Sequence, residues 1–230
     1  MKKLIALICA VAGMLVLVMW QLFSADTNYY LITVIILILS MLPFFVSFEK
    51  SRPSARELTL IAGLIAVAVV SRAVFYLVPQ VKPIGAVVIV CGACLGAKRG
   101  YFIGAMSAFL SNFIFGQGIW TPFQMVALGI VGLAAGLLFN EKAKRVPMAI
   151  AGFVLCFAVY GLIVDLSSVL MMTSDYSAMS VLSIYAAGVP FGFVFGASTA
   201  LFLLLFGEAF AKKINRMVIK YGIPEDKSEK

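Results

Sequence analysis

Long apolar runs recur through this chain, and they constrain its fold more than any other feature. A helix that crosses the hydrocarbon core of a bilayer needs about 20 mostly apolar residues. Only 12% of the residues are charged and 63% are hydrophobic, which leaves too little polar surface for a water-soluble domain. The sequence therefore predicts an all-α polytopic membrane protein. We expect eight spans, at Leu4–Phe23, Tyr30–Phe48, Leu58–Val78, Ile84–Ala97, Tyr101–Phe115, Trp120–Phe139, Pro147–Met172 and Val181–Ala211.

Lysine and arginine lie mostly in short clusters between these runs. Cytoplasmic loops of membrane proteins carry an excess of these residues. Threading eight spans from a cytoplasmic amino terminus places every Lys and Arg inside except Arg72 and Lys82. An odd number of helices would break this pattern, so the charges support the count independently. We therefore expect both termini in the cytoplasm. The first run follows Lys2 and Lys3 as in a signal peptide, but its apolar core is longer than usual for one, so we expect a retained helix.

The chain offers few residues for catalysis. It has no histidine, and its four cysteines lie inside apolar runs, where a free cysteine usually packs as a small hydrophobe. The spacing of Cys91 and Cys94 occurs in redox and metal sites, but no second pair or histidine completes such a site. No phosphate-binding glycine loop is present. We expect no enzyme activity, cofactor, metal or nucleic-acid partner, and a binding or transport role.

Three ionisable residues stand out from the charge pattern. Arg72 falls near the outer end of a span and Lys82 falls in the outer connector that follows it. Either cation could reach lipid phosphates or contact a ligand. Asp165 lies in the interior of a span, where charged groups usually pair or serve function. It could pair with Arg72, bind a ligand or couple an ion.

The segment from Asn112 to Met125 mixes amide and aromatic side chains around two glycines. Aromatic faces beside hydrogen-bonding groups suit an organic ligand in an outward-facing cavity. The alternative is an aromatic belt at the membrane interface. Its candidate ligand contacts are Asn112, Phe115, Gln117, Trp120, Thr121 and Gln124.

Small residues recur at three- or four-residue spacing in several runs. They are Ala62 and Ala66; Gly129, Gly132 and Gly136; and Gly188, Gly192 and Gly196. Such spacing lets helices approach closely. It fits packing within the protein or contact with another membrane subunit.

Residues from about 57 to 211 resemble the S component, the substrate-binding membrane subunit of energy-coupling-factor (ECF) vitamin transporters. Six hydrophobic runs follow the cytoplasmic linker, as in that family. The first run carries Ala62-Gly-Leu-Ile-Ala66, similar to the patch by which S components dock on the shared transmembrane subunit, and Trp120-Thr-Pro-Phe-Gln-Met125 is similar to a stretch of one branch. The resemblance implies a six-helix S-component-like bundle preceded by two additional transmembrane helices, which depart from the family pattern. The expected parts are 1–56 with two helices and a linker, 57–211 with the substrate-binding bundle, and a basic cytoplasmic tail at 212–230.

The resemblance also implies a division of labour. The S component would capture a vitamin or precursor outside the cell, and a separate coupling membrane subunit with two ATPases would drive its release inward. The branch is similar to S components linked to cobalamin or its lower-ligand precursors, while riboflavin, pantothenate and other vitamins remain open. Expected ligand contacts are Arg72, Tyr76, Lys82 and Asp165 together with the Asn112–Gln124 residues, and Ala62 and Ala66 would form the docking patch.

Two rival functions use the same residues differently. A stand-alone secondary transporter would move a small organic solute and use Asp165 for ion coupling. A membrane scaffold would bind no small ligand, so the Asn112–Gln124 side chains would matter only for folding.

Overall fold

The computed structural model describes residues 29–50, 53–139, 144–172 and 177–223, so the expected span at Leu4–Phe23 lies outside the described residues. Within these ranges every regular element is helical. The elements are α2 (Tyr29–Lys50), α3 (Ala55–Val74), α4 (Ile84–Leu95), α5 (Ala97–Phe115), α6 (Thr121–Leu138), α7 (Arg145–Val154), η1 (Leu155–Tyr160), α8 (Gly161–Met172), α9 (Ala178–Phe202), η2 (Leu203–Gly207) and α10 (Glu208–Tyr221).

Four described helical stretches are long and apolar enough to cross a membrane: Ala55–Val74, Thr121–Leu138, Arg145–Met172 and Ala178–Tyr221. The prediction of an all-α polytopic membrane protein is thereby confirmed. Each expected run within the described residues overlaps a helix, and six helical stretches follow α2 in the described part of the chain. The expected run Leu58–Val78 extends too far, because α3 ends at Val74 and turns follow it. The last stretch continues ten residues beyond its expected end at Ala211 because α10 is amphipathic and buries Ala211 and Ile214.

Local signals account for where several helices begin and end. The hydroxyl of Ser54 accepts a hydrogen bond from the backbone N–H of Glu57 and so caps α3. Gly96 has a φ of 90°, which separates α4 from α5 and moves the start of α5 ahead of the expected Tyr101. Pro122 occupies the first turn of α6, where its missing N–H costs no hydrogen bond.

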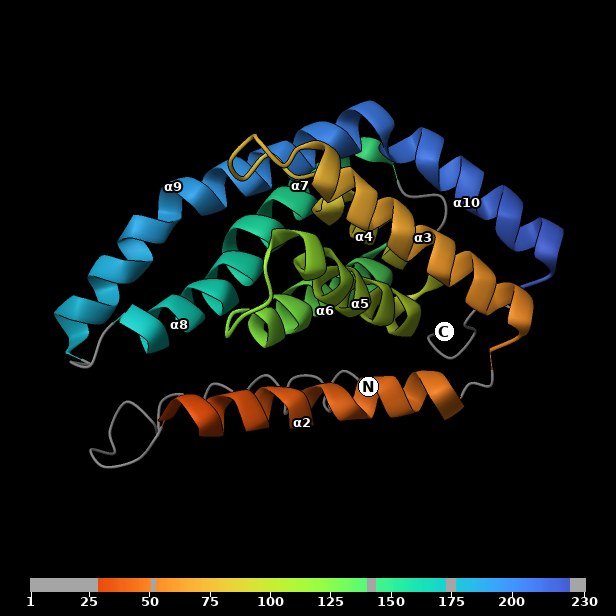
Figure 1. Cartoon of the computed structure of the whole chain (residues 1–230). Coiled ribbons are helices and arrows are strands. Elements are labelled where there is room, and N and C mark those ends of the chain that lie inside the picture. Colours follow the sequence, from red (N-terminus) through yellow and green to blue (C-terminus); the bar gives the residue numbers. More distant parts are fainter. Residues whose placement is uncertain (1–28, 51–52, 140–143, 173–176, 224–230) are drawn as a thin grey trace.

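Two π-helical segments interrupt the longest helices without ending them. The segment η1 joins α7 to α8, and η2 joins α9 to α10. An extra residue per turn changes which side chains face the bundle, and such segments often occur at functional sites. Figure 1 shows α9 and α10 meeting at a bend on one side of the bundle, with α2 on the opposite side in that view.

The centre of the bundle is a close contact among α4, α5 and α6. Helix α4 is almost entirely buried by its neighbours, which explains how so short an apolar helix is accommodated. A Cβ atom added at Gly132 of α6 would collide with the carbonyl oxygen of Gly100 in α5. Glycines 129, 132 and 136 therefore serve packing within the chain, one of the two alternatives that the sequence left open.

Helix α2 packs on this centre through aromatic rings. The rings of Phe44 and Tyr101 stack with centroids 4.0 Å apart, and those of Phe48 and Phe102 stack at 4.2 Å. Burying such large side chains stabilises the contact well beyond a single aliphatic pair. Helix α2, which the sequence places before the bundle, is thus attached to the helices that follow it.

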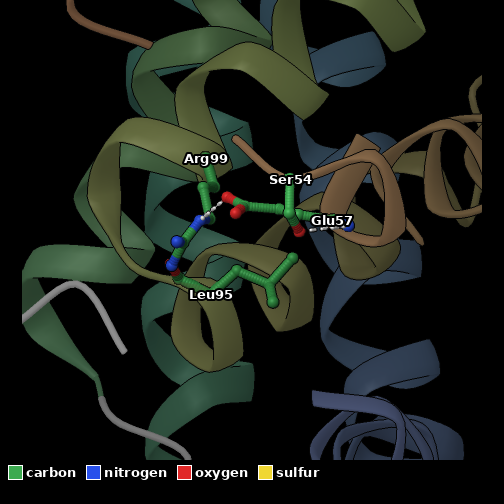
Figure 2. Close-up of polar contacts among 4 residues, drawn as sticks. All are labelled: Ser54, Glu57, Leu95 and Arg99. Atoms are coloured by element: carbon green, nitrogen blue, oxygen red, sulfur yellow. Dashed lines mark hydrogen bonds and ion pairs between the residues drawn. The ribbon is translucent and has the colours of Figure 1, made fainter. Parts of the chain in front are cut away.

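A buried ion pair joins the first turns of α3 and α5. The Nε atom of Arg99 lies 2.7 Å from Oε1 of Glu57, and Arg99 also donates to the carbonyl oxygen of Leu95 (Figure 2). Glu57 is only 3% exposed. Buried charges persist in proteins when they are paired and hydrogen-bonded, as here. The pair fixes the start of α3 against the turn between α4 and α5.

Candidate functional site

A half-open cavity of about 450 Å³ lies at the end of the bundle where α3 ends and α6 begins. Its walls also include the connector between α3 and α4, the first residue of α4, the end of α5, the end of η1, α8 and α9. Its lining residues are Arg72, Tyr76, Pro79, Gln80, Lys82, Ile84, Phe115, Gln124, Leu128, Tyr160, Gly161, Val164, Asp165, Gly188, Phe191, Gly192 and Phe195. Polar and apolar groups share this lining almost equally, so the cavity is more polar than a typical small-molecule site.

Arg72 enters the cavity from the last turn of α3 and is held by α5. Its Nη1 atom donates to the Ser111 hydroxyl and to Oδ1 of Asn112 at 2.9 Å. The Asn112 amide in turn donates to Thr121 at 3.0 Å and to Gln124 at 2.9 Å, both in the first turn of α6. Because Asn112 is fully buried, the guanidinium is fixed by a side chain behind the cavity wall, which Thr121 and the wall residue Gln124 hold in turn.

The connector between α3 and α4 carries Lys82 into the same cavity. Gln80 has a φ of 56°, an uncommon value for a residue other than glycine, and it forms part of the tight turn that precedes Lys82. The Lys82 ammonium donates to the carbonyl oxygens of Phe75 at 2.6 Å and Tyr76 at 3.3 Å. Ser198 of α9 accepts from the Lys82 backbone N–H at 3.4 Å, which ties the connector to α9.

Phe115 brings the two cations together at one wall. Its ring centre lies 4.3 Å from the Arg72 guanidinium carbon and 5.0 Å from the Lys82 ammonium nitrogen. Both distances are in the range of a cation–π contact. The connector residue Lys82 has a pKa below its ordinary value because burial and then the charge of Arg72 disfavour its protonated form.

Asp165 lines the cavity from α8. The structure records no ion pair between it and Arg72, and among the described residues no hydrogen bond or ion pair is recorded for its carboxylate. The pairing of Arg72 with Asp165 that the sequence allowed is therefore wrong, because Ser111 and Asn112 hold the guanidinium instead. A Cβ atom added at Gly188 of α9 would overlap the Asp165 carboxylate, so glycine at this position leaves room for the acid.

The predicted site residues fall into two groups. Arg72, Tyr76, Lys82, Phe115, Gln124 and Asp165 line the cavity. Asn112, Gln117, Trp120 and Thr121 are not part of its lining; Asn112 and Thr121 are buried in the network behind it, and Gln117 accepts from the Thr121 hydroxyl at 3.0 Å. That Trp120 stacks on a ligand stays a prediction.

Sequence reasoning missed most of the lining contributed by η1, α8 and α9. Tyr160, Phe191 and Phe195 are ordinary aromatic residues in apolar runs, and nothing in the sequence separates them from lipid-facing ones. The one sequence pattern that pointed to this region was the four-residue spacing of Gly188 and Gly192, which indicates close helix packing. Both glycines also line the cavity, and Gly188 leaves room for the Asp165 side chain.

The described part of the chain holds no cluster of three metal-ligating side chains. The three described cysteines are unbridged, and Cys91 and Cys156 are fully buried. They do not reach the cavity lining.

The cavity, its polar network and the surrounding helices form an arrangement that could bind a small molecule between the helices. Residues 52–212 match the family model of the ECF-type riboflavin transporter S component. The chain therefore belongs to this family of ECF S components, the substrate-binding membrane subunits of transporters, as the sequence resemblance indicated. Searches of curated proteins and of solved structures gave no match.

Proposed function

We propose that this chain captures a vitamin-sized organic molecule in the cavity between α3, α5, α6, α8 and α9 and delivers it inward with separate energising subunits. The observation that carries the proposal is the cavity itself, whose walls come from helices distributed along the chain, from α3 to α9, and meet at one end of the bundle. A hollow that combines aromatic faces with charged and amide groups offers what recognition of an organic ligand requires. Membership of the S-component family supports the transport role.

The charges support an outward-facing cavity. Basic residues gather at the other end of the bundle, where α5 and α7 begin and α10 lies: Lys98, Arg99, Lys144, Arg145, Lys212 and Lys213. Because cytoplasmic segments are rich in Lys and Arg, that end faces the cytoplasm. The end that holds Arg72 and Lys82 then faces outward, where the substrate is encountered.

The size of the cavity bears on the choice of vitamin. A volume of about 450 Å³ lies in the range of pockets that enclose drug-sized ligands, roughly 300–1,000 Å³. A compact vitamin such as riboflavin, after which the family is described, fits that scale. So does an aromatic lower-ligand precursor of cobalamin, whereas a whole corrinoid is far larger. We therefore place riboflavin-sized aromatic compounds and lower-ligand precursors ahead of intact cobalamin.

The docking proposal rests on α3. Ala62 and Ala66 are both exposed, and a Cβ atom added at Gly63 between them would meet no other group within 4 Å. A lipid-facing helix stripe made of small residues allows another helix to approach closely. We propose that the coupling transmembrane subunit of the ECF module packs on this stripe, with two ATPases bound to that subunit.

Ligand binding by the purified protein tests the proposal. Calorimetry without ATP, run with riboflavin, a lower-ligand base, cobalamin and other vitamins, should show one ligand bound per chain. Phe115→Ala removes a cavity wall and should weaken that ligand about tenfold or more. Phe113→Ala is the matched control because Phe113 is 67% exposed on the same helix and does not line the cavity. Absence of binding across the panel at micromolar concentrations would contradict the proposal.

A stand-alone carrier is the second candidate, and the cavity position of Asp165 favours it. A carrier that couples an ion through this acid would move solute in vesicles that contain this chain alone, and Asp165→Asn would abolish the flux. An S component requires the other subunits and ATP. Flux from the isolated chain would therefore replace the first proposal with the second.

A further inference from the structure

The cavity contains two cations at one wall and a carboxylate at another, and within the described part of the chain none of the three forms an ion pair. Arg72 carries five N–H donors in a planar fork. Within the described part of the chain only its Nη1 atom is recorded as donating, and both partners are neutral oxygens. Its Nε and Nη2 groups therefore remain available to a ligand, in the geometry that binds carboxylate or phosphate in bidentate fashion.

Lys82 adds a second positive charge beside the same ring. Its described partners are backbone carbonyls and the face of Phe115, none of which is an anion. Partial charges of this kind solvate an ammonium but leave its net charge uncompensated. Burial and then the charge of Arg72 lower the pKa of Lys82, as expected for two cations that lie close together.

Asp165 does not neutralise this pair. Arg72 is held by α5 and Lys82 by the end of α3, and the structure records an ion pair for neither with Asp165. The cavity therefore presents a doubly positive wall around Phe115 and a separate acceptor on α8. A ligand that matches both carries an anionic group at one end and an N–H or O–H donor at the other.

We propose that the substrate bears a carboxylate or phosphate that sits between Arg72 and Lys82 at the edge of Phe115, while Asp165 accepts a hydrogen bond from a donor group of the same molecule. This inference rests on the proposed function and narrows the class of substrate. An oxyanion there receives charge-assisted hydrogen bonds from both cations and removes their repulsion. A neutral ligand of the same shape leaves that repulsion in place.

Matched pairs of acid and neutral compounds test the inference. The pairs are flavin mononucleotide with riboflavin, pantothenate with pantothenol, nicotinate with nicotinamide, and biotin with biotin amide. Calorimetry on the purified chain should show the acid of at least one pair binding about tenfold or more tighter than its neutral partner. In Lys82→Gln this preference should fall to within about threefold, because one charge-assisted contact is lost.

The pH dependence gives a second readout. An anion favours the charged lysine and raises its pKa on binding, so binding takes up a proton and affinity falls as pH rises through the lowered pKa of Lys82. Lys82→Arg keeps its charge at high pH and should remove that fall. The charged or titratable groups that line the cavity with Lys82 are Arg72 at the end of α3, Tyr76 in the connector, Tyr160 on η1 and Asp165 on α8.

The possible outcomes separate this inference from the proposed function. A neutral compound that binds as tightly as its acid, or more tightly, overturns the anionic class while the binding role stands. Binding by no compound overturns the proposed function and the inference with it. An acid preference that survives intact in both Lys82→Gln and Arg72→Gln assigns the anion elsewhere and overturns the placement. Lys82→Gln alters a connector residue rather than a helix, so it keeps the test available if Arg72→Gln fails to fold.

Discussion

Replacing Arg99 by methionine should destabilise the protein strongly, because it strands a buried carboxylate. The Glu57–Arg99 contact is 2.7 Å long, and the side chains are only 4% and 12% exposed. At an effective dielectric constant of about 20, two unit charges at that distance attract by about 6 kcal/mol. Much of this offsets the desolvation of both groups. Removing one partner of a buried pair leaves the other charge uncompensated and typically costs about 3–5 kcal/mol.

The expected loss is large enough to measure in micelles. Since ~1.4 kcal/mol corresponds to a tenfold change, the unfolding equilibrium constant of Arg99→Met should rise by roughly two to four orders of magnitude. Titration with sodium dodecyl sulfate, followed by circular dichroism, measures the shift of the midpoint. The control is Glu208→Gln, which breaks the Arg145–Glu208 pair, whose atoms are 3.9 Å apart and whose side chains are 59% and 44% exposed. Such a pair contributes about 0–1 kcal/mol.

A double variant distinguishes loss of the pair from loss of packing. Glu57→Gln combined with Arg99→Met removes both charges, so it should recover part of the stability that Arg99→Met alone loses. Two results would contradict this reasoning. One is a loss of unfolding free energy in Arg99→Met that is no larger than in the Glu208→Gln control. The other is a double variant that is less stable than Arg99→Met, as two independent destabilising substitutions would be.

Two further predictions concern the cavity and the docking stripe. Gly188→Ala should weaken ligand binding about tenfold or more, because the new methyl group displaces the Asp165 carboxylate. Gly192→Ala should change the affinity little, because its Cβ would meet its nearest atom at an ordinary 3.4 Å. Equal effects of the two substitutions in calorimetry would contradict this. Ala66→Trp should abolish co-purification with the coupling subunit while leaving ligand binding intact, since a large side chain on the stripe keeps the partner helix away. Ala186→Trp, on the exposed face of α9, is its control, and assembly that tolerates Ala66→Trp would rule out the stripe as the docking surface.

Part of the site was predictable because membrane burial makes polar residues informative. Arg72, Lys82 and Asp165 stand out in apolar runs, and all three line the cavity. The Asn112–Gln124 segment was also singled out, but its members have different roles. Asn112 is buried behind the wall and orients Arg72, while Phe115 and Gln124 form the wall itself. Spacing along one helix cannot distinguish these roles, because they depend on which neighbour occupies the other side.

The sequence by itself determined that the chain is a multi-helix membrane protein with a polar cluster at one end. The length of each apolar run and the positions of lysine and arginine can be read from short stretches of sequence. The bilayer requires both of them in any helical membrane protein, so they predict the spans without knowledge of the packing. Only the tertiary structure decided which residues meet. It placed Ser111 and Asn112 rather than Asp165 against Arg72, paired Glu57 with Arg99, and brought Tyr160 and Phe195 into the cavity wall. These contacts join residues dozens of positions apart, so they follow from how the helices pack and from no pattern within a single run.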